Sequence, residues 1–357
     1  MSVGERIHQA RKMAQLSLRD LAAKVDVSHA AISKYERGED MPGSGVLLSL
    51  AKALNVRVDY FLRPQSTVLV NPTFRKRASL SKKAKEELIE RTRDWLERYL
   101  EIETIVRAEG SAFHMPPSFP HAVSTVEEIE QAALDLRAEW GLGKEPIRDM
   151  TALLEDKGIK VGLLSAAEAF DACFFWADAD EHIPVIVMRE GNAGDRQRFN
   201  LAHELGHLVL TPKGVDEEKA AMRFAGAFLV PVEAARRELG VPPQRQHVAV
   251  AEFVSLREKY GMSVQAWVYR ASELGFLSQA GNVQMQRYLS TSGNRKQQMG
   301  NDCFEEKPQR QERLVMRACA EELISETRAA ELLGASAKEF AARYYGTPDV
   351  ADDYLCN

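Results

Sequence analysis

The sequence predicts an α+β protein that begins with an all-α domain, and three observations support this prediction. The chain has 357 residues, enough for roughly two or three domains that each bury a core. Residues 2 to 62 carry the caps and apolar spacings of several short helices. Between residues 159 and 188, short β-rich runs stand among segments with helical periodicity. We therefore expect a helical domain followed by a mixed domain with few strands.

The amino-terminal segment has the pattern of a helix-turn-helix. Ser17 caps a helix in which Asp20 completes a variant of the capping box, and this helix ends near Val25. A three-residue turn leads to Ser28, which caps a second helix that Gly38 closes. Residues 1 to 63 hold ten Lys and Arg against seven Asp and Glu, a net +3 within a total of −5. This charge asymmetry indicates that the amino end binds a polyanion.

Breaks in composition divide the rest of the chain. Residues 64–72 form the first break, and residues 81–107 then read as one long amphipathic helix, with Leu88, Trp95 and Ile102 spaced by sevens. We expect this apolar stripe to dock on the chain's own domains rather than to form a dimer seam. Residues 110–120, with three prolines, form a second break. The predicted domains are 1–65, a linker over 66–120, the mixed domain over 121–280, and a loop with a helical tail over 281–357.

Within the mixed domain, the periodicity predicts elements in a definite order. We expect helices over 126–140 and 147–157, strands over 159–163, 173–176 and 184–188, and further helices to about residue 277. Residues 290–311 are predicted to be a flexible loop, and residues 312–345 short helices. The acidic residues of this tail favour a packing module over a second DNA-binding motif.

Composition narrows the class of protein further. Apolar residues make up 45% and charged residues 28%, which excludes wholesale disorder, collagen and coiled-coil rods. No run approaches eighteen apolar residues and the polar first residues do not resemble a signal peptide, so we expect a cytoplasmic protein. Cysteines 173, 303, 319 and 356 lie far apart, which predicts reduced thiols and leaves histidine and carboxylate as metal ligands.

The sharpest chemical signal is the run from His203 to His207, which reads His-Glu-Leu-Gly-His. On a helix the two histidines lie one turn apart on one face, so both imidazoles can bind one zinc ion. Glu204 lies further around the helix, where it can take a proton from an attacking water and pass it to the leaving amine. Zinc in such a site polarises the scissile carbonyl and acidifies the water. An apolar stripe around the motif argues against a chance match.

A catalytic zinc usually has a third protein ligand. Glu218 extends by one turn the predicted buried face of the next helix, which includes Ala221 and Phe224, and is therefore favoured as that ligand. Glu217, Asp216 or a distant residue remain alternatives.

Other parts of a peptidase site stay open at this stage. The run Pro184–Met188 could bind an extended peptide by β-augmentation, or it could be a central strand. Cys173, which Phe174 and Phe175 follow, is predicted to be an inert core thiol. Several residues could stabilise an oxyanion, although a structural role suits each of them better: Arg198, His182, His247, Tyr260 and Tyr269.

The chain resembles the ImmA/IrrE family of zinc metallopeptidases, bacterial and phage proteins that inactivate helix-turn-helix repressors by proteolysis. The likeness runs from about residue 75 to 345, and the family often has Met in place of Val230 and His in place of Thr211. By this resemblance His203, His207 and Glu218 correspond to zinc ligands and Glu204 to the catalytic base. The residues that carry the likeness are Trp140-Gly-Leu-Gly143, Pro146-Ile147, Arg198-Phe199, His203 to His207, Glu218, Ala221, Phe224-Ala225, Phe228 to Pro231, and Lys259 to Ala266.

The amino end resembles the Xre and phage-repressor DNA-binding domain, through Leu16-Ser17, Leu21-Ala22, Ile32-Ser33, Glu36, Gly38, Pro42 and Leu50 to Leu54. The resemblance implies that the second helix enters the major groove, with His29, Ala30, Lys34 and Ser33 facing bases. It implies that Arg11, Ser17 and Arg37 lie near phosphates. The family often has Gln in place of Leu18. Because a net charge of +3 gives weak binding by one copy, we expect a homodimer on operator DNA.

Two functions from different classes follow. The first is a DNA-binding zinc endopeptidase that regulates transcription in a stress, phage or mobile-element response, cutting a helix-turn-helix repressor or its own hinge. The second is a non-catalytic, antitoxin-like repressor whose zincin domain serves as a sensor or a protein-binding module. The carboxylate at Glu204 favours the first, because a site without catalysis has no chemical need for it.

Overall fold

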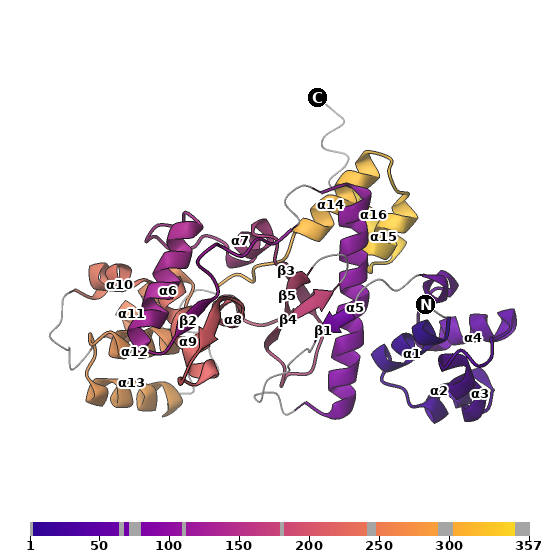
Figure 1. The fold of residues 1–357 in the computed structure, drawn as a ribbon, viewed down its shortest axis with the longest axis horizontal. Helices are drawn as coiled ribbons and strands as arrows, with labels where there is room; N and C mark the ends of the chain where they lie inside the picture. Colours follow the sequence, from indigo (N-terminus) through magenta and orange to yellow (C-terminus); the bar gives the residue numbers. More distant parts are fainter. Residues whose placement is uncertain are drawn as a thin grey trace.

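The computed structural model describes residues 3–63, 68–70, 80–108, 112–178, 182–240, 248–291 and 303–346. Figure 1 shows a helical domain at one end of the molecule, a small sheet crossed by a long helix in the middle, and a second group of helices at the other end. The structure thus confirms the predicted α+β class. Cys356 and His247 lie outside the described residues.

The amino-terminal domain consists of four helices and a 3-10 turn around one apolar core. The predicted capping box is present: the Ser17 hydroxyl accepts from Asp20 N–H at 3.1 Å, and the Asp20 carboxylate accepts from Ser17 N–H at 2.9 Å. Ser28 caps the next helix through Ala31 N–H, and Gly38 has the expected positive φ of 70°. The elements are α1 (Val3–Met13), α2 (Leu18–Val25), α3 (His29–Glu36), α4 (Ser44–Leu54) and η1 (Val58–Leu62).

The central sheet has the strand order β1-β4-β5-β3. β4 is antiparallel to both β1 and β5, and β3 is parallel to β5. Of the two interpretations of Pro184–Met188, the structure therefore supports a central strand. β4 and β3 occupy the two edges of β5, so neither edge is open to a peptide. The strands are β1 (Val68–Val70), β3 (Lys160–Leu164), β4 (Ala172–Asp178) and β5 (His182–Arg189). A separate parallel pair joins β2 (His121–Val123) to β6 (Leu210–Pro212).

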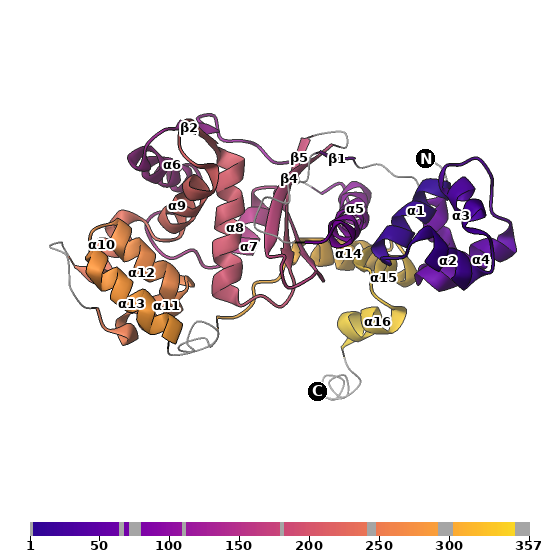
Figure 2. The same ribbon diagram turned by 90° about the horizontal axis from the view of Figure 1, so that it is seen from below.

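The sheet separates two apolar cores, because alternate side chains of a strand point to opposite faces. On β5, Val185 and Val187 belong to one core, and Ile186 and Met188 to the other. The first core contains the long helix α5 (Lys82–Ile105) and the second contains α8 (Gly194–Val209). Figure 2 shows α5 and α8 on either side of the strands.

The long helix α5 docks on the chain's own domains, as its apolar stripe predicted. Leu88, Trp95 and Ile102 are all buried in the first core. The tail helices pack on the same helix, and Val315 and Leu332 join its core. The tail consists of α14 (Arg310–Ala320), α15 (Glu326–Leu333) and α16 (Ala337–Tyr345), which confirms the predicted packing module.

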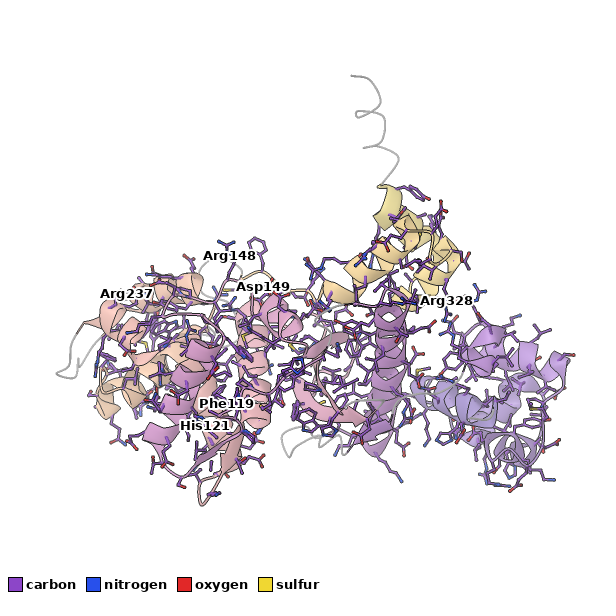
Figure 3. The ribbon with its side chains drawn as sticks, turned by 45° about the horizontal axis from the view of Figure 1, so that its top comes forward. Phe119, His121, Arg148, Asp149, Arg237 and Arg328 are labelled. Carbon is purple, nitrogen blue, oxygen red and sulfur yellow. The ribbon has the colours of Figure 1, made fainter. Side chains whose placement is uncertain are left out.

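The second core is built mainly from helices around α8. Leu201 and Leu205 of α8 lie in it beside Phe224 and Phe228 of α9 and Trp267 of α12. Phe119 and His121, which Figure 3 labels beside one another, stack at its margin with ring centroids 4.2 Å apart. The helices are α6 (Val126–Glu139), α7 (Met150–Asp156), α9 (Glu217–Leu229), α10 (Val232–Leu239), α11 (Val250–Tyr260), α12 (Val264–Glu273) and α13 (Gln279–Thr291).

The expectation of a flexible loop over 290–311 is wrong for residues 303–309. α13 continues to Thr291, and residues 303–309 are fixed against α7 and α8. The Glu306 carboxylate accepts from the N–H groups of Met150 and Thr151, at 2.9 and 3.0 Å, and pairs with Arg198. Gln197 forms two hydrogen bonds to the Glu306 backbone. A polar composition predicted mobility, but these polar groups have partners in the fold.

A close contact between α8 and α9 depends on Gly206. A Cβ atom at this position would lie 3.2 Å from both Ala221 Cα and Phe224 Cδ1, tighter than ordinary packing. The side chain of a larger residue would therefore force the two helices apart.

We expect Gly206→Val to lower the free energy of unfolding by about 1–3 kcal/mol, as overpacking does elsewhere. Gly45, in α4, is the matched control, because a Cβ there would meet no atom within 4 Å. Gly45→Ala should leave stability unchanged or raise it by up to about 1 kcal/mol. Urea denaturation of both variants measures the difference, and an equal midpoint for Gly206→Val and wild type would contradict the packing argument.

In the described part of the chain, no helix has both the length and the apolar composition needed to cross a membrane.

Candidate metal centre and DNA-binding surface

The two motif histidines and Glu218 converge on one point between α8 and α9. The His203 and His207 Nε2 atoms lie 3.1 Å apart. The Glu218 carboxylate oxygens lie 3.4 Å from His203 Nε2 and 3.6 Å from His207 Nε2. These three side chains form the one group of metal-ligand type found among the described residues.

The donor set and its spacing fit a zinc ion. Zinc–nitrogen and zinc–oxygen bonds of about 2.0–2.2 Å in a tetrahedron place the ligand atoms about 3.4 Å from one another. The three measured separations bracket this value. Two imidazole nitrogens and one carboxylate are also the ligands of known catalytic zinc sites.

The local structure explains why these side chains meet. His203 and His207 lie one turn apart on α8, with His207 3% exposed at its side chain. The close packing at Gly206 brings the first turn of α9 next to the same face. Glu218, 34% exposed, therefore points at the histidines from the adjacent helix.

The other two carboxylates of the acidic cluster have different partners. Asp216 caps α9 by accepting from Lys219 N–H at 2.9 Å. Glu217 Oε1 lies 3.6 Å from His207 Nδ1, on the side of the imidazole that faces away from Glu218. Glu217 is thus placed to orient the ring rather than to join the ligand set. This geometry supports Glu218 over Glu217 and Asp216 as the third ligand.

Glu204 is half-buried on α8, the helix that packs against β4. Burial raises the pKa of the Cys173 thiol well above its usual value, and the negative charge of Glu204 raises it further. Cys173 on β4 is therefore an inert, protonated thiol, as predicted, and Glu204 lies within electrostatic reach of that strand.

Three of the candidates for oxyanion stabilisation, Arg198, Tyr260 and His182, have structural partners. Arg198 pairs with Glu306 and also donates to the carbonyl oxygen of Ile147. The Tyr260 hydroxyl donates to Glu238 at 2.9 Å. His182 stacks on Trp176, outside the group of metal-ligand type.

The predicted base-reading residues lie on an open surface of the amino-terminal domain. His29, Ala30 and Lys34 are exposed along α3, and Ser33 is half-buried. Arg37 is exposed and donates to Ser33 Oγ at 2.6 Å. Ser17 is exposed at the start of α2.

Arg11 corrects the predicted phosphate contacts. Its guanidinium is buried, where it pairs with Glu36 and donates to Leu16 O at 2.9 Å. These partners hold the group inside the domain, where Arg11 ties α1 to α3, so the structure favours a structural role over the predicted phosphate contact.

Comparison with known proteins identifies both parts of the chain. A family described as "Helix-turn-helix" matches residues 7–61, and a family described as "IrrE N-terminal-like domain" matches residues 154–272. The chain is thus similar to a helix-turn-helix domain at its amino end and to an IrrE-like domain in its middle. The IrrE-like match contains the metal cluster and the whole of α8 and α9.

Curated relatives resemble a shorter stretch of the chain. The HTH-type transcriptional regulator ImmR of Bacillus subtilis is 33% identical over 73 residues, which is 20% of this chain and 58% of ImmR. The HTH-type transcriptional regulator DicA of Escherichia coli is 32% identical over 88 residues, 25% of this chain and 65% of DicA. Repressor protein C2 of Salmonella phage P22 is 43% identical over 61 residues, 17% of this chain and 28% of the repressor. The chain thus spans between about a quarter and two thirds of each of these relatives.

The Arg11–Glu36 pair gives the helix-turn-helix domain a predicted pH dependence. Burial alone would raise the pKa of Glu36, but hydrogen bonds from Arg11 and His8 outweigh it and lower the pKa below 4.5. A lowered pKa in the folded state stabilises the fold above the unfolded value, and this stabilisation is lost as pH falls through the folded value.

We therefore expect hydrogen-exchange protection of α1 and α3 to fall as pH drops below about 4.5. Glu36→Gln should lower protection at pH 7 and flatten this acid response. A variant as protected as wild type at pH 7, with the same acid response, would contradict the role of this pair.

Sequence reasoning missed two features of the IrrE-like domain's surroundings. Arg198 and Glu306 form an ion pair although they lie 108 positions apart in the sequence, and no local sequence pattern predicts such a contact. The contribution of β1 to the sheet was also missed, because Val68–Val70 is too short to stand out in a proline-rich break.

Proposed function

We propose that this chain is a DNA-binding zinc metalloendopeptidase that regulates transcription. The observation that carries the proposal is the convergence of His203, His207 and Glu218. Glu204 directly follows His203 on the same helix. The helix-turn-helix match on the same chain supports an action of this chemistry beside DNA. The regulators and repressors among the relatives support a role at operator DNA, where we propose that a homodimer binds.

His203, His207 and Glu218 would hold the zinc ion, with zinc supplying Lewis-acid polarisation of a peptide carbonyl and a more acidic water. Glu204 would accept the proton of the attacking water and deliver it to the leaving amine. Glu217 would fix the orientation of His207 through Nδ1. The low exposure of both histidines keeps competing water away from the ligand atoms.

We infer that the substrate is an extended protein segment bound at the outer edge of β4. β1 pairs with Trp176 to Asp178 only, and no other described strand pairs with this edge at Ala172–Phe175. Within the described residues this part of the edge has no strand partner, so a peptide strand could pair there, on the strand against which α8 packs. A helix-turn-helix repressor is the proposed substrate. The protein's own linker is a second one, because β1 already lies on the same edge.

The test is incubation of the zinc-loaded chain with the repressor encoded beside its gene, followed by intact mass spectrometry. We expect two fragments whose masses add to the repressor plus one water, or fragments of the chain itself. A zinc-chelated sample provides the control and should remain uncut. Intact masses of both proteins in the zinc-loaded sample would count against a peptidase and favour the non-catalytic regulator.

A further inference from the structure

The long helix α5, which lies outside the helix-turn-helix match, borders the DNA-binding surface. α1 packs along α5, and three polar contacts fix the two together. Arg6, 2% exposed, pairs with Glu97 at 2.6 Å; Lys12 pairs with Glu86 at 2.6 Å; and Gln15 donates to Glu87. The helix-turn-helix domain therefore presents its surface to DNA in a fixed relation to the amino end of α5.

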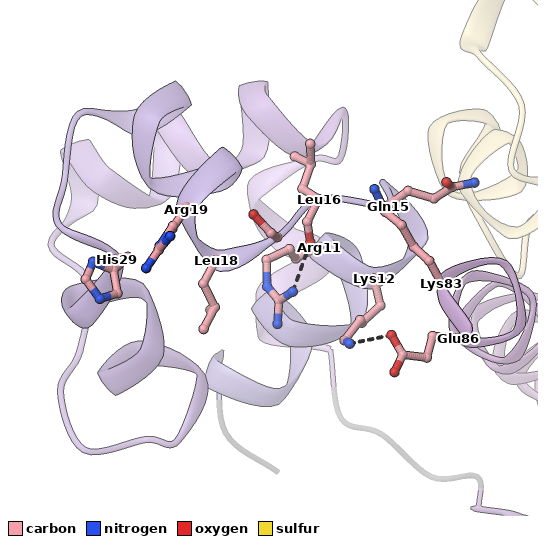
Figure 4. A pocket seen from close by; sticks show the side chains of 10 residues that line it. Arg11, Lys12, Gln15, Leu16, Leu18, Arg19, His29, Lys83 and Glu86 are labelled. Atoms are coloured by element: carbon pink, nitrogen blue, oxygen red, sulfur yellow. Dashed lines mark hydrogen bonds and ion pairs between the residues drawn. The ribbon is translucent and has the colours of Figure 1, made fainter. Parts of the chain in front are cut away.

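A cavity of about 570 Å³ lies at this junction, beside the start of α2. Figure 4 shows its lining: His29 and Arg19 at one end, and Lys83 and Glu86 of α5 at the other. Lys83 lines the same cavity as Ser17 and Leu18, at the start of α2.

Some of the cationic side chains at this cavity form ion pairs and others do not. Lys12 is neutralised by Glu86, and Arg11 by Glu36. Within the described residues, Arg19 and Lys83 form no ion pair, and both are exposed. Two cations from separate parts of the chain thus face one cavity.

The orientation of α3 indicates where the backbone of a bound DNA duplex would lie relative to this cavity. His29 begins α3, whose first residues face base edges in the major groove in this motif. In this motif the helix before the recognition helix crosses the DNA backbone, so we expect phosphates near the start of α2. The cavity extends from His29 and Ser17, at this point, to Lys83 of α5.

We propose that Lys83 of α5 contacts a backbone phosphate of the bound duplex, next to the base pairs that α3 reads. This inference rests on the proposed DNA binding and extends it to a helix outside the DNA-binding domain. Arg19 binds the same stretch of backbone from α2. The DNA surface is thus completed by the docking of α5, which also packs on the sheet of the peptidase domain.

The test uses the full-length, zinc-loaded chain and a duplex that it selects from a random-sequence pool. Fluorescence anisotropy gives Kd at several KCl concentrations for wild type, Lys83→Gln and the control Lys82→Gln. Lys82 is the preceding exposed lysine of α5 and does not line the cavity.

One lost phosphate contact makes the negative slope of log K against log salt shallower by about 0.9, and weakens binding about fivefold at 0.15 M salt. We expect both effects for Lys83→Gln, to the same extent on the selected duplex and on a shuffled one, because phosphate contacts carry no sequence information. Lys82→Gln should match wild type.

An unchanged slope for Lys83→Gln would overturn the inference, and so would an equal loss in both variants, which would mark a general charge effect. Failure of wild type to select or bind any duplex would instead overturn the DNA-binding function itself.

Discussion

Glu204→Gln should abolish peptide hydrolysis while zinc and DNA binding remain. Glutamine keeps the size of the side chain but cannot accept the proton of the attacking water, and loss of a general base lowers rates by about 10²- to 10⁴-fold. Because Glu204 is not among the converging ligand atoms, the affinity for zinc should change little. The measurement is cleavage of the repressor, followed by mass spectrometry, beside zinc titration and DNA binding of the same preparation.

Glu190→Gln is the matched control for this prediction, because it removes an exposed carboxylate just after β5 and away from the metal ligands. It should cut at the wild-type rate. Retained cleavage by a pure Glu204→Gln preparation would contradict the proposed role of Glu204.

Arg137→Met should cause a large loss of stability. Arg137 is 1% exposed and donates to three backbone carbonyls, those of Gly143, Phe228 and Glu145, at 2.6–2.8 Å. Burial lowers the pKa of this guanidinium to about 10, so it remains charged at neutral pH. Methionine fills a similar volume but leaves the buried Phe228 carbonyl oxygen without this donor, at about 1–3 kcal/mol, and removes two further charged hydrogen bonds to the exposed residues Gly143 and Glu145.

We expect Arg137→Met to lower the free energy of unfolding by about 2–4 kcal/mol. Arg237→Met is the control, since Arg237 is half-exposed and pairs with the exposed Glu145. Its loss should amount to about 1 kcal/mol or less. Urea denaturation of both variants decides the comparison, and equal midpoints would contradict the structural role of Arg137.

Much of the architecture follows from local sequence. Ser17 with Asp20, and Ser28 before α3, specify the ends of helices through groups that are close in the chain, so the turn between α2 and α3 is predictable. The sevenfold spacing of Leu88, Trp95 and Ile102 likewise predicts the buried stripe of α5. The spacing of His203 and His207 places both on one face of a helix whatever surrounds it.

The rest depends on contacts between distant parts of the chain. An arginine at position 11 could equally contact a phosphate or form a buried ion pair. Only the fold, which brings Glu36 next to Arg11, distinguishes these two roles. The polar residues 303–309 predict a loop, and their fixed position depends on Arg198 and the start of α7. Lys83 is one of several lysines in its segment, and only the docking of α1 on α5 gives it a place beside α2.

The most direct test of the central claim is anomalous diffraction at the zinc edge from crystals of the zinc-loaded chain. The account predicts one strong peak between α8 and α9, with His203 Nε2, His207 Nε2 and a Glu218 oxygen each about 2.0–2.2 Å from the ion. It predicts Glu217 at His207 Nδ1, outside the coordination sphere. A peak bound by Glu217 or Asp216, or zinc only at sites away from α8, would contradict the metal centre described above.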